Sequence, residues 1–383
     1  EVDAYAVGRA LTEIALRHDS LCLRFGHDEE GAVRQSIVPT EDVPVALCDL
    51  SALEAEALAR RIDALRVAEG EAEIALFSDA PLFRATLLVL PGRRRRLLWT
   101  VHHLVSDGTS QGLLGRELAA RLAGRPWTTD APPSMRDIAA WAGARNASAQ
   151  AARSHFRELL AAPYRHRYLP DRLRCNDPQR CHAIEAAVRG TLRDAVVAAA
   201  RRLKCTPYVL YVGAYFRWLA ALTECDDLVV VTPLAGRAHP QVAQAIGDFI
   251  NLVPLRVTGL GALSPGQLVE RVRDGIALAA RHQDFQFDQV LDELGLSPGA
   301  DRNPLTGFSL NFMPQADGDA PGLATPRHAD RGYRLKYDLL MLIRGWHDAT
   351  HVEFQYRAGL LSPSEIEECF TDYCSHLEAL SHA

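Results

Sequence analysis

Apolar residues in the first half of the chain recur at helical intervals in some segments and at every second position in others. Spacings of three and four predict helices, and alternation predicts half-buried strands. Helices are predicted over residues 7–14, 109–122 and 134–160, and strands over 21–25, 33–38, 83–90 and 95–101. Another helix is expected after Ser51, whose side chain would cap it in a capping box with Glu54. Because no N-cap or turn precedes the first helical pattern, we expect part of the natural chain to precede residue 1.

The second half repeats this mixture of elements. Strands are predicted over 183–189, 227–233, 249–257, 308–312, 337–343 and 351–356, and helices over 192–203, 207–222, 264–282 and 362–380. A Pro- and Arg-rich stretch, residues 166–180, separates the two halves and is the predicted linker. The sequence thus predicts an α/β (α+β) fold of two lobes, residues 1–165 and 181–383.

Composition supports two globular lobes and excludes several classes of function. The 383 residues are 48% hydrophobic and 23% charged, with a net charge of −6, so we expect no basic field for nucleic acid or an anionic membrane. Since neither a run of membrane-spanning length nor a signal-peptide pattern is present, we expect a cytoplasmic protein without a membrane partner. The eight cysteines form no CxxC pair, and no nucleotide-binding glycine motif occurs, so we expect no metal site and no tightly bound cofactor.

The most informative segment is His102-His103-Leu104-Val105-Ser106-Asp107-Gly108, which lies between a predicted strand and a predicted helix. An imidazole with a pKa of about 6.5 can accept a proton from an attacking amine or hydroxyl at neutral pH. Free N–H groups near Gly108 can stabilise an oxyanion, whereas Asp107 is better suited to an ion pair that holds the loop. The pattern favours acyl transfer. The alternative is a histidine pair that only satisfies buried backbone groups.

A serine-hydrolase interpretation rests on the string Gly108-Thr109-Ser110-Gln111-Gly112. In such hydrolases a strand runs directly into the first glycine of the string. Here the polar segment 102–107 intervenes, which disfavours Ser110 as a nucleophile without removing the alternative.

The histidine segment matches the HHxxxDG motif of the chloramphenicol acetyltransferase-like superfamily. Further segments resemble, in order, the RHExLRTxF, GR, IGxFVN, SRNPLF and FDL elements of condensation domains from nonribosomal peptide synthetases. These segments are residues 17–25, 236–237, 246–251, 301–305 and 337–339. The chain as a whole therefore resembles a condensation domain.

This resemblance implies two acetyltransferase-like lobes in a V-shaped pseudo-dimer with a central tunnel. Donor and acceptor peptidyl carrier proteins would present their substrates there on phosphopantetheine arms, so that the chain itself binds no cofactor. An acceptor aminoacyl amine would attack the donor thioester to form an amide, in a protein that is monomeric or part of a larger synthetase. His103, the second histidine of the motif, would position or deprotonate the amine, with His102 beside it and the Gly108 N–H near the thioester oxygen.

The resemblance also suggests supporting residues. Arg237 is the predicted partner of Asp107, and Arg17 is the second choice. Asn251 and Asn311 are expected on strands that line the cleft, where they would bond the loop or the substrate; a purely structural role is the alternative for each. Residues 314–334 are the predicted latch, reaching from the second lobe onto the first.

Three alternatives to carrier-to-carrier condensation remain open. The first is a free-standing amide or ester synthase that uses a free nucleophile. The second is an epimerisation domain, which the continuation Asp107-Gly108-Thr109-Ser110-Gln111 disfavours because it lacks the Ser-Trp pair that such domains usually show. The third is a noncatalytic domain that recruits other enzymes, against which the histidine at position 103 argues.

Overall fold

The computed structural model describes residues 2–147, 149–161, 168–170, 172–173, 175–237, 239–297, 299, 301–313, 327–345 and 349–382. The chain forms two compact units. Unit 1 comprises Glu1–Arg145 and Ala235–Ile250, and unit 2 comprises Asn146–Leu234 and Asn251–Ala383. Among the described residues, no helix has both the length and the apolar character needed to cross a bilayer.

Unit 1 is built around a sheet of three strands in the order β3-β4-β5, accompanied by a separate two-stranded sheet of β1 and β2. Strand β3 is parallel to β4, and β4 is antiparallel to β5. The elements of this unit are α1 (Ala4–Arg17), β1 (Leu23–His27), β2 (Val33–Ile37), β3 (Val45–Asp49), α2 (Ala55–Glu71), β4 (Phe83–Val89), β5 (Arg95–Val101), α3 (Gly108–Leu122) and α4 (Met135–Ala147).

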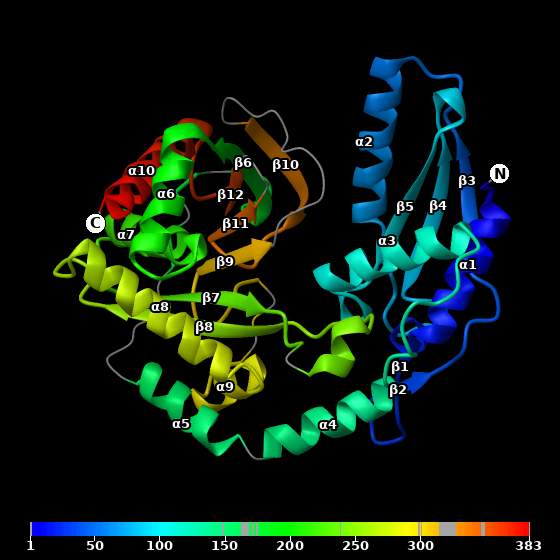
Figure 1. Cartoon of the computed structure of the whole chain (residues 1–383), viewed down its shortest axis with the longest axis horizontal. Helices are drawn as coiled ribbons and strands as arrows, with labels where there is room; N and C mark the ends of the chain where they lie inside the picture. The colour runs from blue at the N-terminus through cyan, green and yellow to red at the C-terminus, as the bar shows by residue number, and fades with distance from the viewer. Residues whose placement is uncertain are drawn as a thin grey trace. The chain divides into compact units, whose positions relative to one another are not determined.

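Both faces of the three-stranded sheet are covered because neighbouring strand residues point to opposite sides. Leu87 on β4 packs into the core that α1 and α3 share. The next residue, Leu88, packs into a smaller cluster with side chains of α2 such as Leu58 and Ile62. Figure 1 shows α2 along one side of these strands, with α1 and α3 on the other. The histidine motif, which follows β5 directly, is therefore attached to a sheet that is packed on both faces.

Unit 2 holds a seven-stranded mixed sheet in the order β10-β6-β12-β11-β9-β7-β8. Its elements are α5 (Gln150–Leu159), β6 (Arg180–Val188), α6 (Gly190–Arg202), α7 (Pro207–Thr223), β7 (Asp227–Leu234), β8 (Asn251–Thr258), α8 (Pro265–Arg281), α9 (Phe287–Glu293), β9 (Phe308–Met313), β10 (Arg327–Arg334), β11 (Leu339–Gly345), β12 (Thr350–Arg357) and α10 (Pro363–Ser381). The mixed α/β architecture predicted from the sequence is therefore present in both units.

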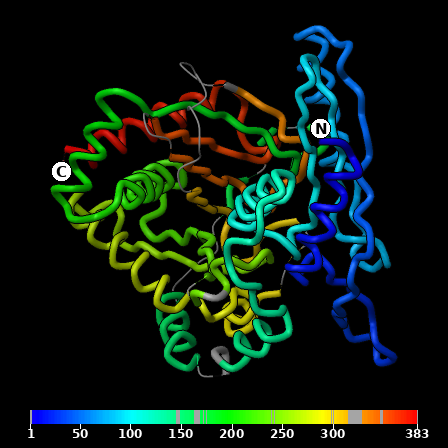
Figure 2. Tube along the Cα trace, turned by 45° about the vertical axis from the view of Figure 1, so that its right-hand side comes forward, coloured from blue at the N-terminus to red at the C-terminus, as the bar shows by residue number. Residues whose placement is uncertain are grey.

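The core of unit 2 lies between its sheet and the helices α6, α7, α8 and α10. The trace in Figure 2 shows the C-terminal helix α10 running beside α7, with which it makes extensive contacts. Trp218 of α7 stacks on Phe354 of β12 with ring centroids 4.8 Å apart. Since aromatic side chains bury large apolar areas, such pairs anchor the helices to the sheet.

The units divide the chain differently from the predicted boundaries 1–165, 166–180 and 181–383. Helix α5 belongs to unit 2 because Ala152 and Phe156 are buried in the core of that unit. Segment 235–250 leaves unit 2 and returns to unit 1. This return brings residues of the predicted GR and IGxFVN elements beside the histidine motif.

Three local predictions need correction. The first helix, α1, does have an N-cap within the chain, because Asp3 Oδ1 accepts from the Ala6 N–H at 2.7 Å. The helix predicted over 134–160 is two helices, α4 and α5. The N-cap of α2 is Glu54 and not Ser51, since the Ser51 N–H donates to Asp49 Oδ1 at 2.9 Å. Within the predicted latch, residues 327–334 form β10, which pairs with β6 in unit 2; the reach of the latch onto the first lobe stays a prediction. Residues 314–326 lie outside the described residues.

Candidate functional site

The histidine motif forms a tight connection between β5 and α3. The His102 N–H donates to Leu82 O at 2.8 Å, which continues the sheet by one residue. His103–Val105 form a 3-10 turn, and the Leu104 N–H donates to His102 Nδ1 at 3.2 Å. His102 is thus the cap of this turn, and its Nδ1 is committed to the backbone. Gly108 is exposed and is the first residue of α3, where helix N–H groups have no partner within the helix.

Asp107 is the N-cap of α3 and lies in a buried ion pair with Arg237. Its Oδ1 and Oδ2 accept hydrogen bonds from Arg237 Nη2 at 2.8 and 2.9 Å. The two side chains are 1% and 7% exposed. The same carboxylate accepts from the Ser110 N–H at 2.8 Å and from the Phe249 N–H at 3.3 Å. The predicted Asp107–Arg237 pair is confirmed, and it ties segment 235–250 to the start of α3.

Arg237 also organises its own segment. Its Nη1 donates to Val242 O at 2.8 Å and to Ala245 O at 2.7 Å, and the guanidinium lies 4.4 Å from the centre of the Phe249 ring. The preceding Gly236 has φ +62°, and a Cβ there would be 1.8 Å from Phe249 O. Only glycine fits this position, because both the backbone angle and the close approach exclude a side chain.

Ser110 is fully buried beside the ion pair. Its hydroxyl lies 2.8 Å from both Asp107 Oδ1 and Gly247 O, which share its single proton, and it accepts from the Gly247 N–H at 3.0 Å. Arg237 Nη2 also donates to it at 2.9 Å. A hydroxyl held in this way links the loop to segment 235–250 and is not placed to attack a substrate. These contacts argue against the hydrolase alternative.

His103 is in a different environment from the residues around it. Its side chain is 70% exposed, and Nδ1 lies 3.3 Å from Asp248 Oδ2. The hydrogen bond to Asp248 raises the pKa of His103 above its ordinary value, against the opposing effect of burial, and the charges of Asp248 and Asp107 add to the rise. His103 is therefore an accessible imidazole beside a carboxylate, on a loop whose residues 105–107 are buried.

Two further residues at this loop, Asp248 and His18, were not predicted as site residues from the sequence. Asp248 stands at the variable position of the IGxFVN element, where an acidic residue was the one available signal. His18 is 2% exposed; its Nε2 bonds Glu117 Oε2 at 2.8 Å, and its Nδ1 accepts from the Ile246 N–H at 3.1 Å. His18 thus joins α1, α3 and segment 235–250.

The structure does not bring every predicted residue to this loop. Arg17 donates to Thr129 Oγ1 at 2.9 Å and lies 3.6 Å from Glu117 Oε1, so it is not the partner of Asp107. Asn251, in unit 2, donates to the carbonyls of Gln283 and Phe285, both at 2.7 Å. Its Oδ1 accepts from the Phe287 N–H at 3.0 Å. These contacts give Asn251 a structural role at the start of α9. Asn311 is partly buried on β9.

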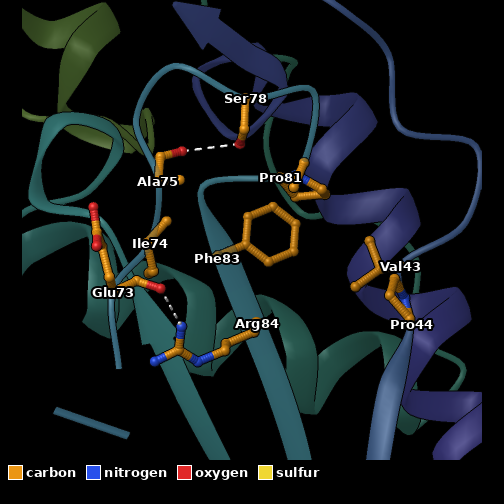
Figure 3. Close-up of a pocket in the computed structure, with 10 residues that line it drawn as sticks. Val43, Pro44, Glu73, Ile74, Ala75, Ser78, Pro81, Phe83 and Arg84 are labelled. Carbon is orange, nitrogen blue, oxygen red and sulfur yellow. Dashed lines mark hydrogen bonds between the residues drawn. The ribbon is translucent and has the colours of Figure 1, made fainter. Parts of the chain in front are cut away.

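Unit 1 also contains a cavity of about 310 Å³ that the motif does not line. Figure 3 shows the Phe83 ring within it, with Pro81 and Val43 on one side and Ile74 on the other. The Ser78 hydroxyl donates to Ala75 O at 2.9 Å, and Arg84 donates to Glu73 O at 3.2 Å. Because its lining is mainly apolar and these polar groups are already paired, the cavity offers no evident catalytic group.

Known proteins are similar to this chain along its whole length. The family model described as "Condensation domain" matches residues 1–383. Tyrocidine synthase 3 of Brevibacillus parabrevis is 27% identical over 97% of this chain, although the match covers only 6% of that synthase. For the next two curated relatives the match covers 10% of their length.

Solved structures share the fold. The X-domain from teicoplanin biosynthesis aligns with a TM-score of 0.83 at 22% identity, over 100% of this chain and 88% of that one. The first condensation domain of the calcium-dependent antibiotic synthetase, solved with a substrate analogue, aligns with a TM-score of 0.76 at 22% identity, over 99% of this chain and 88% of that one. The fold, the ordered motifs and the family match agree, and the chain belongs to the condensation-domain family.

Proposed function

We propose that this domain catalyses amide formation between two acyl groups that carrier proteins present on phosphopantetheine arms. In the reaction, the amine nitrogen of the acceptor aminoacyl group attacks the carbonyl carbon of the donor thioester. The new C–N bond forms, the C–S bond breaks, and the thiol of the donor arm leaves. The chain needs no cofactor of its own for this step, because both reacting groups arrive on their carriers.

His103 is the proposed general base. The attacking amine loses a proton as the C–N bond forms, and a neutral imidazole nitrogen can accept it and then return it to the departing sulfur. Such assistance contributes roughly 10² to 10⁴-fold to a rate. The exposed N–H groups at the start of α3, near Gly108, are the proposed donors to the oxyanion. Holding the amine beside the thioester contributes more, because proximity and orientation can lower the activation free energy by about 7 to 11 kcal/mol.

The main support for this proposal is that His103 differs in burial and bonding from the residues that hold its loop. Asp107, Arg237 and Ser110 are buried and bonded to one another, whereas His103 is exposed with a raised pKa. If the histidine pair only satisfied buried backbone groups, both rings would be buried and committed. The half-buried His102 meets one part of that description, since its Nδ1 accepts from the Leu104 N–H, whereas the exposed His103 meets neither part.

Intact-protein mass spectrometry of the two carriers tests the proposal. A donor carrier loaded with an acyl group and an acceptor carrier loaded with an aminoacyl group are incubated with wild type, His103→Ala or His27→Ala. His27 is an exposed histidine of β1 and serves as the matched control. We expect condensed product on the acceptor carrier with wild type and His27→Ala, and a rate at least about 100-fold lower with His103→Ala.

Other outcomes separate the alternatives. Wild-type turnover by His103→Ala would refute the assignment of His103. Product only with free amines or alcohols would indicate a free-standing amide or ester synthase. If wild type forms no product with any donor and nucleophile, exchange of the α-hydrogen for deuterium would indicate epimerisation, and its absence would favour a recruiting domain.

A further inference from the structure

The segment that carries Asp248 is fixed against the histidine loop on both sides of that residue. Before it, the Gly247 N–H donates to Ser110 Oγ at 3.0 Å. After it, the Phe249 N–H donates to Asp107 Oδ2 at 3.3 Å. Asp248 Oδ1 accepts from the Ile250 N–H at 3.3 Å, which leaves Oδ2 facing His103 Nδ1 at 3.3 Å. The carboxylate is thus held by its own backbone beside one edge of the imidazole.

On the basis of the function proposed above, we propose that Asp248 is the positioning residue of His103. Its carboxylate orients the ring through Nδ1 and stabilises the imidazolium that forms when Nε2 accepts the proton of the acceptor amine. Asp248 touches neither substrate, and it acts only through His103.

The hydrogen-bonding chemistry of the two groups supports this assignment. An ionised carboxylate can only accept hydrogen bonds, so the imidazole nitrogen that faces it must carry the proton. In neutral His103 that nitrogen is Nδ1, and the free lone pair is therefore on Nε2. When Nε2 takes up a proton, both partners of the contact carry a charge, so the hydrogen bond to the carboxylate becomes an ion pair and is strengthened.

The charges around His103 point in the same direction. Asp248 faces the ring from segment 235–250, and Asp107 acts from the start of α3. The charge of Asp107 is compensated by Arg237, which donates to both of its oxygens. His102, the neighbouring residue on the loop, has its Nδ1 bonded to the backbone. Among the described residues, Asp248 bonds no other charged group than His103, and its hydrogen bond is the main cause of the raised pKa of His103.

The proposal has a defined consequence for the dependence of activity on pH. Because the pKa of His103 is raised, the ring remains protonated, and inactive as a base, up to a higher pH than an ordinary histidine. In Asp248→Asn the pKa falls towards its usual value, so the acid limb of the pH profile of kcat moves to lower pH. Since His103 is exposed and screened by solvent, we expect this displacement of the acid limb to be small.

The magnitude of the rate effect is bounded by His103→Ala. At the pH optimum, Asp248→Asn should lower kcat by roughly tenfold and leave KM nearly unchanged, whereas removal of the base itself costs about 10² to 10⁴-fold. In the His103→Ala background, Asp248→Asn should cause no further loss. A merely structural role would instead add its loss to that background. The Asn side chain keeps the shape of Asp and can still accept from the Ile250 N–H, so the fold should be retained.

The experiment combines an NMR titration of His103, which needs no substrate, with the pH profile of the carrier assay. His103→Gln assigns the imidazole resonance, and Asp63→Asn on α2 is the control, because Asp63 has the same charge and is 71% exposed. We expect Asp248→Asn to lower the pKa of His103 and to move the acid limb by the same amount, while Asp63→Asn moves neither. An unchanged pKa would refute the pairing. A shifted pKa with an unmoved acid limb would refute the role in the reaction. If Asp248→Asn lowers the pKa of His103 but the wild-type domain forms no product, the proposed function is refuted and the pairing of the two residues still holds.

Discussion

The buried ion pair of Asp107 and Arg237 makes a quantitative prediction about stability. Both side chains are less than a tenth exposed, so removing either one leaves an uncompensated charge in a site without solvent. This typically costs about 3 to 5 kcal/mol. Asp107→Ala should lie at the upper end, because it also removes the cap of α3, which costs about 0.5 to 2 kcal/mol. Arg237→Ala leaves Asp107 with donors from Ser110 and Phe249 and should cost less.

The double variant separates the pair from its surroundings. The double variant contains no unpaired buried charge, because both partners are removed. Its loss in free energy of unfolding should therefore be smaller than the sum of the two single losses. The coupling expected for residues in one ion-pair network is about 0.5 to 3 kcal/mol. Hydrogen exchange measured by mass spectrometry is the suitable assay, because it reports unit 1 and unit 2 separately in the intact chain.

Peptides that cover α3 and residues 239–250 should exchange roughly 10² to 10⁴-fold faster in the single variants, since each factor of ten corresponds to about 1.4 kcal/mol. Peptides from the seven-stranded sheet of unit 2 should be unaffected and serve as the internal control. Strictly additive losses in the double variant, or wild-type protection in Asp107→Ala, would show that the ion pair does not hold the loop.

Three further predictions concern single positions. Gly236→Ala places a Cβ 1.8 Å from Phe249 O at a positive φ; backbone strain alone costs about 1 to 3 kcal/mol, and an unchanged melting temperature would contradict this. Ser110→Ala should lower the melting temperature by leaving buried groups unsatisfied, about 1 to 3 kcal/mol, and a serine-reactive probe that labels wild type at Ser110 would overturn its structural role. Burial would raise the pKa of Glu353, but the Gln355 amide and two guanidinium groups lower it below 4.5. Glu353 therefore stabilises the fold above that pH and loses this contribution as the pH falls through its folded value; thermal unfolding between about pH 5 and 3 should show a shallower decline for Glu353→Gln.

Much of the architecture follows from local patterns. Capping residues and apolar periodicity located most helices, because an N-cap such as Ser264 or Ser362 satisfies free N–H groups at a position that the sequence itself marks. The Asp107–Arg237 pair was predicted from the order of family motifs and the need of a loop carboxylate for a cation. Both inferences depend on features that short stretches of sequence carry.

Other features depend on contacts between distant residues and were not predicted. Segment 235–250 returns to unit 1 because its polar groups find partners there, such as the Ile246 carbonyl, which accepts from Ser20 Oγ at 2.6 Å. Nothing in the apolar pattern of the segment marks that return. The same holds for Asp248, which meets His103 across 145 positions of sequence. Its role follows only once the segment has been placed.

Two carboxylates that flank one loop have opposite surroundings, and this difference assigns their roles. Asp107 is buried, and its oxygens are occupied by a guanidinium and by backbone and hydroxyl donors. The charge of Asp107 is already balanced by Arg237, so Asp107 responds little when His103 gains a proton. The Asp248 side chain is 27% exposed, and it bonds only one backbone N–H besides His103 in the described part of the chain. Asp107→Asn should therefore change stability more than the pH profile, whereas Asp248→Asn should move the pH profile with little change in stability. The reverse pattern would show that the difference in burial does not decide which carboxylate stabilises the loop and which one sets the pKa of His103.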